Sequence, residues 1–343
     1  MGNIQFLKKQ GRSSLLDPAE GYVRKDLSFE LRTDPLTGRQ SRILTFRRRK
    51  LPGMEIPLQM IEASQAGCPF CPDRVLTATP RFIADPAPGE RMKRGRAVMF
   101  PNSFPYALHN WVVVFSEDHF LPLERFSVET LRDAFLLARD GILRTGNADP
   151  LMRYASINWN YLPQSGGGLF HPHLQSVLEE VPTVSHREVL KGLDEYLAGS
   201  GSGFWKDFLA EEIRRGERYI GRCGDVHFVS AFSPRGILGE VVILFPERTE
   251  VEDLEEEVWD DFFTGLTCFF KYLVEKKIFS FNLSLFFGGP REAPSWIYGR
   301  VCPRMTLPPW NTSDINYFEK LHGEVICVVS PEELCAELKP FFV

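Results

Sequence analysis

The chain has 343 residues, 43% hydrophobic and 25% charged, a globular composition whose length favours two domains, or two halves of one unit, over a single core. Its net charge of −5 supplies no basic balance for holding phosphate backbones, so a nucleic-acid partner is not expected. It contains no run of eighteen apolar residues and no apolar signal segment at its start, so we expect a cytoplasmic protein without a membrane anchor.

The N-terminal part of the chain is basic. Residues 1–57 are rich in Arg and Lys, and the run Arg47-Arg48-Arg49-Lys50 is typical of a solvated surface. Two alternatives for this run are nucleic-acid binding and an approach to a nucleotide phosphate. The span 80–96 is rich in proline and charge, so we expect an exposed loop of the kind that often covers a site.

A unit of strands and one long helix follows. Residues 97–100 and 111–115 are runs of strand-forming residues separated by a proline-rich turn, and residues 154–159 return as a strand. Between them Ser127 is placed to cap a helix whose apolar residues fall on one side. The helix is therefore expected to pack on one face of these strands.

The same order recurs in the second half, with strands at 226–231, 241–245 and 279–287 and a helix after the second of them. Phe115 precedes His171 by 56 residues and Phe245 precedes Val301 by 56, which predicts an internal duplication with Val301 at the place of His171. We therefore expect an α+β fold of two related halves, residues 1–185 and 186–343, each an antiparallel sheet with a long helix packed on it.

The sequence His171-Pro172-His173-Leu174-Gln175 is the sharpest local signal. In an extended segment the side chains of His171, His173 and Gln175 point to one face. The motif follows three consecutive glycines, 166–168, which allow a backbone to approach a ligand closely. This pattern indicates a site and not a pair of surface histidines.

A second signal is the pair Cys68 and Cys71, the only closely spaced cysteines of the seven. Two thiolates at this spacing can bind one metal ion, and zinc fits them best. The remaining ligands must come from far along the chain, and His119 and His171 are the natural candidates. A redox dithiol is the alternative, but it would require a strand before the motif and a helix after it, whereas turn-forming residues flank this one.

Five segments together resemble the galactose-1-phosphate uridylyltransferases, a branch of the histidine-triad superfamily, in their order and spacing. The segments are Glu30 to Arg39, Cys68 to Pro72, Asn102 to Pro105, Phe115 to His119 and His171 to Gln175. The resemblance implies two histidine-triad-like halves, the second degenerate, and a homodimer. It also implies one Zn²⁺ per chain, on Cys68, Cys71, His119 and His171.

The resemblance further implies roles for individual residues. His173 would be the nucleophile and Gln175 would hold the phosphoryl group. Asn102 and Phe104 would line the nucleoside pocket, and Asn158 or Asn160 would lie beside the phosphates. Backbone donors at Gly167 and Gly168 would help to stabilise the charge on the phosphoryl oxygens.

These roles agree with the chemistry of histidine. A nucleophilic imidazole must be neutral, and a hydrogen bond from its other nitrogen to the carbonyl of His171 would fix the reactive tautomer. A metal ion on His171 would then organise the nucleophile. The resemblance implies a ping-pong exchange between UDP-glucose and galactose 1-phosphate, in galactose metabolism, through a nucleotidyl-histidine.

Two departures from the family leave alternatives open. Gly168 stands where family members often have a small polar residue, and residues 296–300 contain no histidine for a second metal ion, so none is expected there. These changes affect the acceptor side, so a phosphorylase acting on ADP-sugars or dinucleoside polyphosphates is the alternative enzyme. A zinc-stabilised nucleotide-binding protein without turnover is the alternative from another class.

Overall fold

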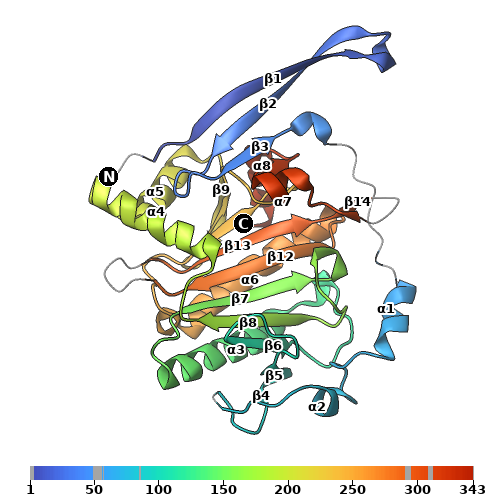
Figure 1. Cartoon of the computed structure of the whole chain (residues 1–343), viewed down its shortest axis with the longest axis vertical. Coiled ribbons are helices and arrows are strands. Elements are labelled where there is room, and N and C mark those ends of the chain that lie inside the picture. Colours follow the sequence, from blue (N-terminus) through green and yellow to red (C-terminus); the bar gives the residue numbers. More distant parts are fainter. Residues whose placement is uncertain are drawn as a thin grey trace.

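The computed structural model describes residues 4–48, 56, 58–84, 86–289, 295–307 and 312–342. A ten-stranded antiparallel sheet in the order β4-β5-β6-β8-β7-β12-β13-β11-β10-β9 forms its centre (Figure 1). The strands of this sheet are β4 (Met92–Arg94), β5 (Ala97–Pro101), β6 (His109–Val114), β7 (Tyr154–Tyr161), β8 (His173–Glu179), β9 (Tyr219–Cys223), β10 (Val226–Ser230), β11 (Val241–Leu244), β12 (Ser280–Phe287) and β13 (Tyr298–Arg304).

The strand order repeats outward from the central pair β7–β12. On each side of that pair comes the last sheet strand of the half and then its three earlier strands. Each half inserts one long helix before its central strand. These helices, α3 (Val128–Ala148) and α6 (Glu256–Glu275), pack on each other and on one face of the sheet. The predicted α+β fold is confirmed, with the two sheets joined into one. The division at residue 185 stays a prediction.

The position of the duplication was predicted wrongly at Val301. The backbone N–H of Phe115 donates to the carbonyl of Pro172, and that of Phe245 donates to the carbonyl of Ile297, at 3.2 Å in both cases. Trp296 and Tyr298 are therefore the counterparts of His171 and His173. Counting equal numbers of residues failed because the second half has shorter connections, so that Phe115 to His173 spans 58 residues and Phe245 to Tyr298 only 53.

The alternation of side chains gives the sheet two different faces. Alternate residues of β7 and β12, such as Trp159 and Phe281, are buried against α3 and α6. The intervening residues are polar and point to the other face, Asn158 and Asn160 on β7 and Asn282 on β12. This row of polar residues lies between β8 and β13.

The α3 helix begins as expected, because the Ser127 hydroxyl accepts from the Thr130 amide at 3.1 Å.

Smaller elements cover part of the polar face and its edges (Figure 1). Helices α4 (Val184–Ser200) and α5 (Phe204–Arg215) pack against β10, β11 and β13. The three N-terminal strands, β1 to β3, were not predicted from the sequence. The other elements are β1 (Leu7–Asp17), β2 (Val23–Thr33), β3 (Gln40–Ile43), β16 (Val325–Cys327), α1 (Leu58–Gln65), α2 (Val75–Ala78), β14 (Thr306–Leu307), β15 (Thr312–Ser313), α7 (Tyr317–His322) and α8 (Pro331–Leu338). The β1–β2 hairpin extends away from the rest of the chain.

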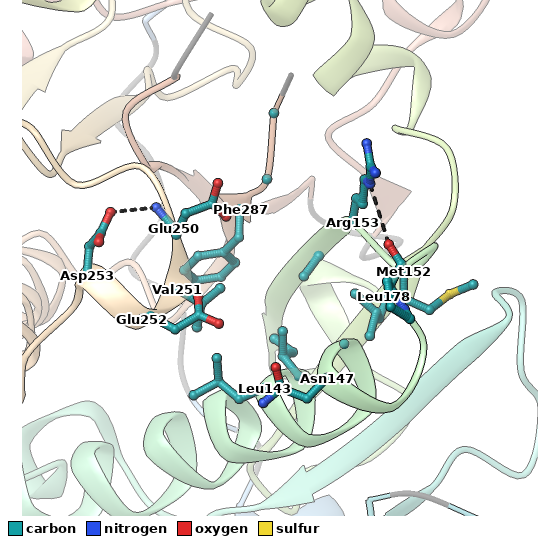
Figure 2. A pocket seen from close by; sticks show the side chains of 16 residues that line it. Leu143, Asn147, Met152, Arg153, Leu178, Glu250, Val251, Glu252, Asp253 and Phe287 are labelled. Atoms are coloured by element: carbon teal, nitrogen blue, oxygen red, sulfur yellow. Dashed lines mark hydrogen bonds between the residues drawn. The ribbon is translucent and has the colours of Figure 1, made fainter. Parts of the chain in front are cut away.

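A cavity of about 580 Å³ lies on the helix face of the sheet, between the end of α3 and the short helix η5 (Val251–Asp253). Figure 2 shows Leu143, Leu178 and Phe287 lining it together with the carboxylates of Glu250 and Glu252. Because Leu178 and Phe287 belong to the core under the helices, this cavity is on the side of the sheet opposite the polar row. No helix among the described residues is long and apolar enough to cross a membrane.

Candidate active site

His173 and Gln175 lie at the start of β8, on the face that α3 and α6 leave uncovered. The register pairs His173 with Val114 of β6, and places Gln175 between Val112 of β6 and Asn158 of β7. Both side chains therefore lie at one end of the polar row. The predicted one-sided arrangement of the motif follows from the strand alternation.

Four predicted metal ligands, Cys68, Cys71, His119 and His171, come together beside β8. Their ligand atoms all lie within 4.8 Å of one another, and all four residues are buried. The Nδ1 atom of His119 is 3.4 Å from the Cys71 sulfur, and that of His171 is 3.7 Å and 3.8 Å from the two sulfurs. Two sulfurs and two imidazole nitrogens are a donor set that fits a tetrahedral metal ion.

The hydrogen bonds of the two histidines orient them for this role. Nε2 of His171 donates to the Ser116 carbonyl at 2.8 Å, and Nε2 of His119 donates to the Ile61 carbonyl at 3.2 Å. Since a carbonyl can only accept, each ring carries its proton on Nε2 and turns the lone pair of Nδ1 toward the sulfurs. Carbonyl partners of this kind fix ligand histidines in many metal sites. Sequence reasoning missed Ser116 and Ile61, because backbone carbonyls leave no sequence signal.

Burial favours the neutral forms of Cys71, His119 and His171 by shifting their pKa values. It lowers the pKa of His171 to about 4, and together with the neighbouring Cys68 it raises the pKa of Cys71 to about 11. The imidazoles are thus neutral at pH 7, as ligands must be. Metal binding would require the thiols to lose their protons.

The predicted hydrogen bond that fixes the tautomer of His173 is present. Its Nδ1 lies 2.9 Å from the carbonyl oxygen of His171, to which it can only donate, so Nε2 carries the lone pair. The ring is 7% exposed, and burial lowers its pKa, which favours the neutral form at pH 7. The ring of Phe70 packs edge-on at 5.3 Å from it. His173 is therefore held as a neutral imidazole with Nε2 available.

The amides near His173 have different freedom to bind a ligand. Asn158 accepts from the Ser284 hydroxyl at 2.7 Å and donates to the Ser156 hydroxyl at 2.9 Å and to the Gln175 carbonyl at 3.2 Å. Its amide is fully used in bracing the sheet. Among the described residues the Asn160 side chain makes one hydrogen bond, in which its Oδ1 accepts from Asn282. Of the two asparagines, Asn160 retains its N–H donors.

Tyr106 is a site residue that the sequence did not reveal. Its hydroxyl donates to Oε1 of Gln175, so the oxygen of the Gln175 amide faces Tyr106 and Nε2 is the donor end of the amide. Tyr106 belongs to the connection between β5 and β6, the same segment as Asn102 and Phe104. This contact ties that segment to the β8 motif.

Asn102 and Phe104 shape a turn in this structure. Asn102 donates to the Asn110 side chain at 2.8 Å and accepts from the Phe104 amide at 3.0 Å, while the Phe104 ring is 87% exposed. The two glycines also differ, because a Cβ on Gly167 would meet the Leu162 carbonyl oxygen at 2.9 Å, whereas Gly168 faces open space. The structure thus gives Gly167 a packing role, and the ligand-binding roles of these residues stay predictions.

The described part of the basic run, Arg47 and Arg48, does not contact the residues of this site. Arg48 pairs with Glu333 and Glu337 of α8, and Arg47 is exposed. The Ser330 hydroxyl accepts from the Glu333 amide and so caps α8, while the Glu333 carboxylate pairs with Arg48. Arg49 and Lys50 lie outside the described residues.

The chain is similar in sequence to one archaeal protein and in fold to several solved structures. It is 30% identical over 322 residues to an uncharacterized protein of Archaeoglobus fulgidus, covering 93% of this chain and 94% of that one. An ADP-glucose phosphorylase from Arabidopsis thaliana, solved with bound ADP-glucose, superimposes with a TM-score of 0.70 at 16% identity, and a uridylyltransferase with 0.65 at 18%. In both cases 91% of this chain and 98% of the other are covered.

No family model matches the chain. The similarity to the archaeal protein extends over nearly the full length of both chains, and the two solved structures match this chain over 91% of its length. The chain therefore belongs to one family with the Archaeoglobus fulgidus protein and has the fold of the uridylyltransferase and of the ADP-glucose phosphorylase.

Proposed function

We propose that this protein is a nucleotidyltransferase that passes a nucleoside monophosphate from a nucleotide sugar to a phosphate acceptor through a covalent bond to His173. The observation that carries the proposal is the hydrogen bond from Nδ1 of His173 to the carbonyl of His171 at 2.9 Å. It leaves a neutral, oriented Nε2 lone pair on the uncovered face of the sheet. A histidine with only a structural role would have no need of this arrangement beside a metal-ligand cluster.

In the first displacement, Nε2 of His173 attacks the α-phosphorus of the nucleotide sugar. The P–N bond forms as the bond from this phosphorus to the bridging oxygen breaks, and the electron pair leaves with the sugar 1-phosphate. The ring becomes a cation that still carries its proton on Nδ1, so its hydrogen bond to the His171 carbonyl strengthens. A phosphate oxygen of the acceptor then attacks the same phosphorus and returns the lone pair to Nε2.

Two amides would stabilise the charge on the phosphoryl oxygens. Gln175 accepts from Tyr106 and Asn160 accepts from Asn282 through their side-chain oxygens, so both have N–H groups left for a ligand. Donors fixed before the reaction stabilise a charged transition state without reorganisation. Gly168, with open space at its Cβ position, allows a phosphate to approach the backbone.

We propose Zn²⁺ as the metal of the Cys68, Cys71, His119 and His171 cluster, one ion per chain. The mixed sulfur and nitrogen donor set supports zinc. Bound there, the ion would have a structural role by holding His171. The carbonyl of His171 would then stay in place for His173.

For the substrate, we propose UDP-glucose and galactose 1-phosphate exchange, as in the uridylyltransferases whose motifs the sequence resembles. The second candidate is an ADP-sugar phosphorylase, supported by the TM-score of 0.70 with a phosphorylase that binds ADP-glucose. We also propose a homodimer from the same likeness. Light scattering that gives the mass of one chain would contradict the dimer.

Isotope exchange without an acceptor tests the function. The protein is incubated with labelled glucose 1-phosphate and either UDP-glucose or ADP-glucose, and label entering the nucleotide sugar is measured. A ping-pong enzyme exchanges label in the absence of any second substrate, and His173→Gly abolishes it. Tight nucleotide binding without exchange would instead support the non-catalytic alternative.

A further inference from the structure

The second half carries polar side chains on the same face as His173 although its own histidine positions are lost. Asp314 is the outermost of them, and its carboxylate binds Arg304 on β13, with Nε 2.9 Å from Oδ1 and 3.0 Å from Oδ2. The side chains are 2% and 13% exposed. The Met305 amide also donates to Asp314 at 3.1 Å. The guanidinium of Arg304 is thus fixed in position by a buried partner.

Arg304 determines which way the amide of Asn282 faces. Its Nη1 lies 2.5 Å from Oδ1 of Asn282, and because a guanidinium has no acceptor, this amide atom must be the oxygen. The Nδ2 of Asn282 is therefore on the other side. There it donates to Oδ1 of Asn160 at 2.6 Å and to the Ser165 carbonyl at 2.9 Å.

Asn282 in turn determines which way the amide of Asn160 faces. Since Nδ2 of Asn282 can only donate, the Asn160 atom that it meets must be Oδ1. No acceptor in the described part of the chain uses the two hydrogens on Nδ2 of Asn160. The β7–β8 pairing ends at Asn158 and Gln175, and Asn160 and His173 are the next residues of their two strands on the same face. The Asn160 amide and the His173 ring therefore share this face of the sheet.

We propose that Arg304 and Asn282 of the second half are positioning residues that hold the Asn160 amide with its N–H donors toward the transferred phosphoryl group. This rests on the proposed function of His173. Without Arg304 and Asn282, the Asn160 amide could rotate and present its oxygen to the phosphoryl oxygens. The two like charges would then repel each other. Asn158 needs no such control, because its three hydrogen bonds already use the whole amide.

Asn282→Asp tests the inference with a change of almost no volume. The aspartate still accepts from Arg304, but it has no hydrogen to donate to Asn160, so two oxygens face each other and the Asn160 amide turns. We expect single-turnover formation of nucleotidyl-His173 to slow about 100-fold, as for loss of one charge-stabilising donor, with the melting temperature kept. Asn160→Ala should slow it by a similar factor.

The double variant separates positioning from general damage. If Asn282 acts through Asn160, Asn160→Ala/Asn282→Asp is no slower than Asn160→Ala alone. Asn147→Asp makes the same chemical change at an exposed position on the helix face and keeps the wild-type rate. A double variant slowed by the product of the two single-variant factors would overturn the inference. A wild-type rate for Asn282→Asp would do the same.

Arg304→Met provides a second variant if Asn282→Asp does not fold. It removes the fixed donor but leaves both asparagines, so we expect a smaller loss that disappears in the Asn160→Ala background. An undiminished loss in that background would overturn the inference. If the wild-type protein forms no nucleotidyl-histidine, the proposed function itself fails. A wild type that forms it, with Asn282→Asp equally fast, would refute only the positioning role.

Discussion

Replacing Cys71 by Ser should remove the metal ion and loosen three separate parts of the chain. The cluster joins the segment at residues 68–71 to His119, which follows β6, and to His171, which precedes β8. A ligand bound only by the folded state stabilises it by about 4 kcal/mol at a free concentration 1,000 times its dissociation constant. We take this as the effect of a tightly held zinc ion.

That free energy converts to a measurable change in melting temperature. With an unfolding entropy of roughly 2 cal/mol/K per residue, the 343 residues give about 0.7 kcal/mol/K. Loss of the ion should then lower the melting temperature by about 6 °C. The serine variant, or wild-type protein treated with a zinc chelator, should melt lower by this amount.

The assay combines thermal unfolding with metal analysis of the purified proteins. Cys268→Ser is the matched control, because Cys268 lies on α6, away from the metal-ligand cluster, and is partly exposed. We expect one zinc per chain in the wild type and in Cys268→Ser, and little in Cys71→Ser. A Cys71→Ser protein that keeps a full equivalent of zinc and the wild-type melting temperature would refute the assignment of this cluster.

Three further changes test other parts of the structure. Burial lowers the pKa of His186 to about 4, whereas its value in the unfolded chain is about 6.5. The free energy of unfolding should therefore fall by about 2 kcal/mol as the pH falls from 7 to 5. His186→Phe should reduce this pH dependence, measured by denaturant titration. Gly167→Ala should lower the melting temperature and Gly168→Ala should not, because only the first added Cβ meets backbone, and equal shifts would contradict this. Tyr106→Phe frees the Gln175 amide and should slow nucleotidyl transfer severalfold in stopped-assay kinetics, with unchanged stability.

The strands and long helices were predictable because their signals are local. Apolar alternation identified β7 and β12, and Ser127 identified the start of α3. The metal cluster was predictable from residue chemistry, since Cys68 and Cys71, three positions apart, required distant partners. What could not be predicted was the β1–β2 hairpin, whose mixed, largely exposed residues give no periodic apolar signal.

The remaining site residues depend on strand pairing, which the sequence does not specify. Asn282 and Ser284 lie on a strand that was predicted, and two polar residues alternating within an apolar strand were a usable signal. Their partners, however, follow from the pairing of β12 with β7, which joins the two halves. The error at Val301 has the same cause, because connection lengths changed while the pairing did not.

The covalent bond to His173 is the central claim, and direct trapping tests it. Zinc-loaded protein is incubated with UDP-glucose or ADP-glucose labelled at the α-phosphate, quenched in alkali, and mapped by peptide mass spectrometry. We predict label on the peptide that contains His173, from the nucleotide that the enzyme uses, and none on His173→Gly. Turnover of either donor with no label on His173, or label on another residue, would contradict the claim.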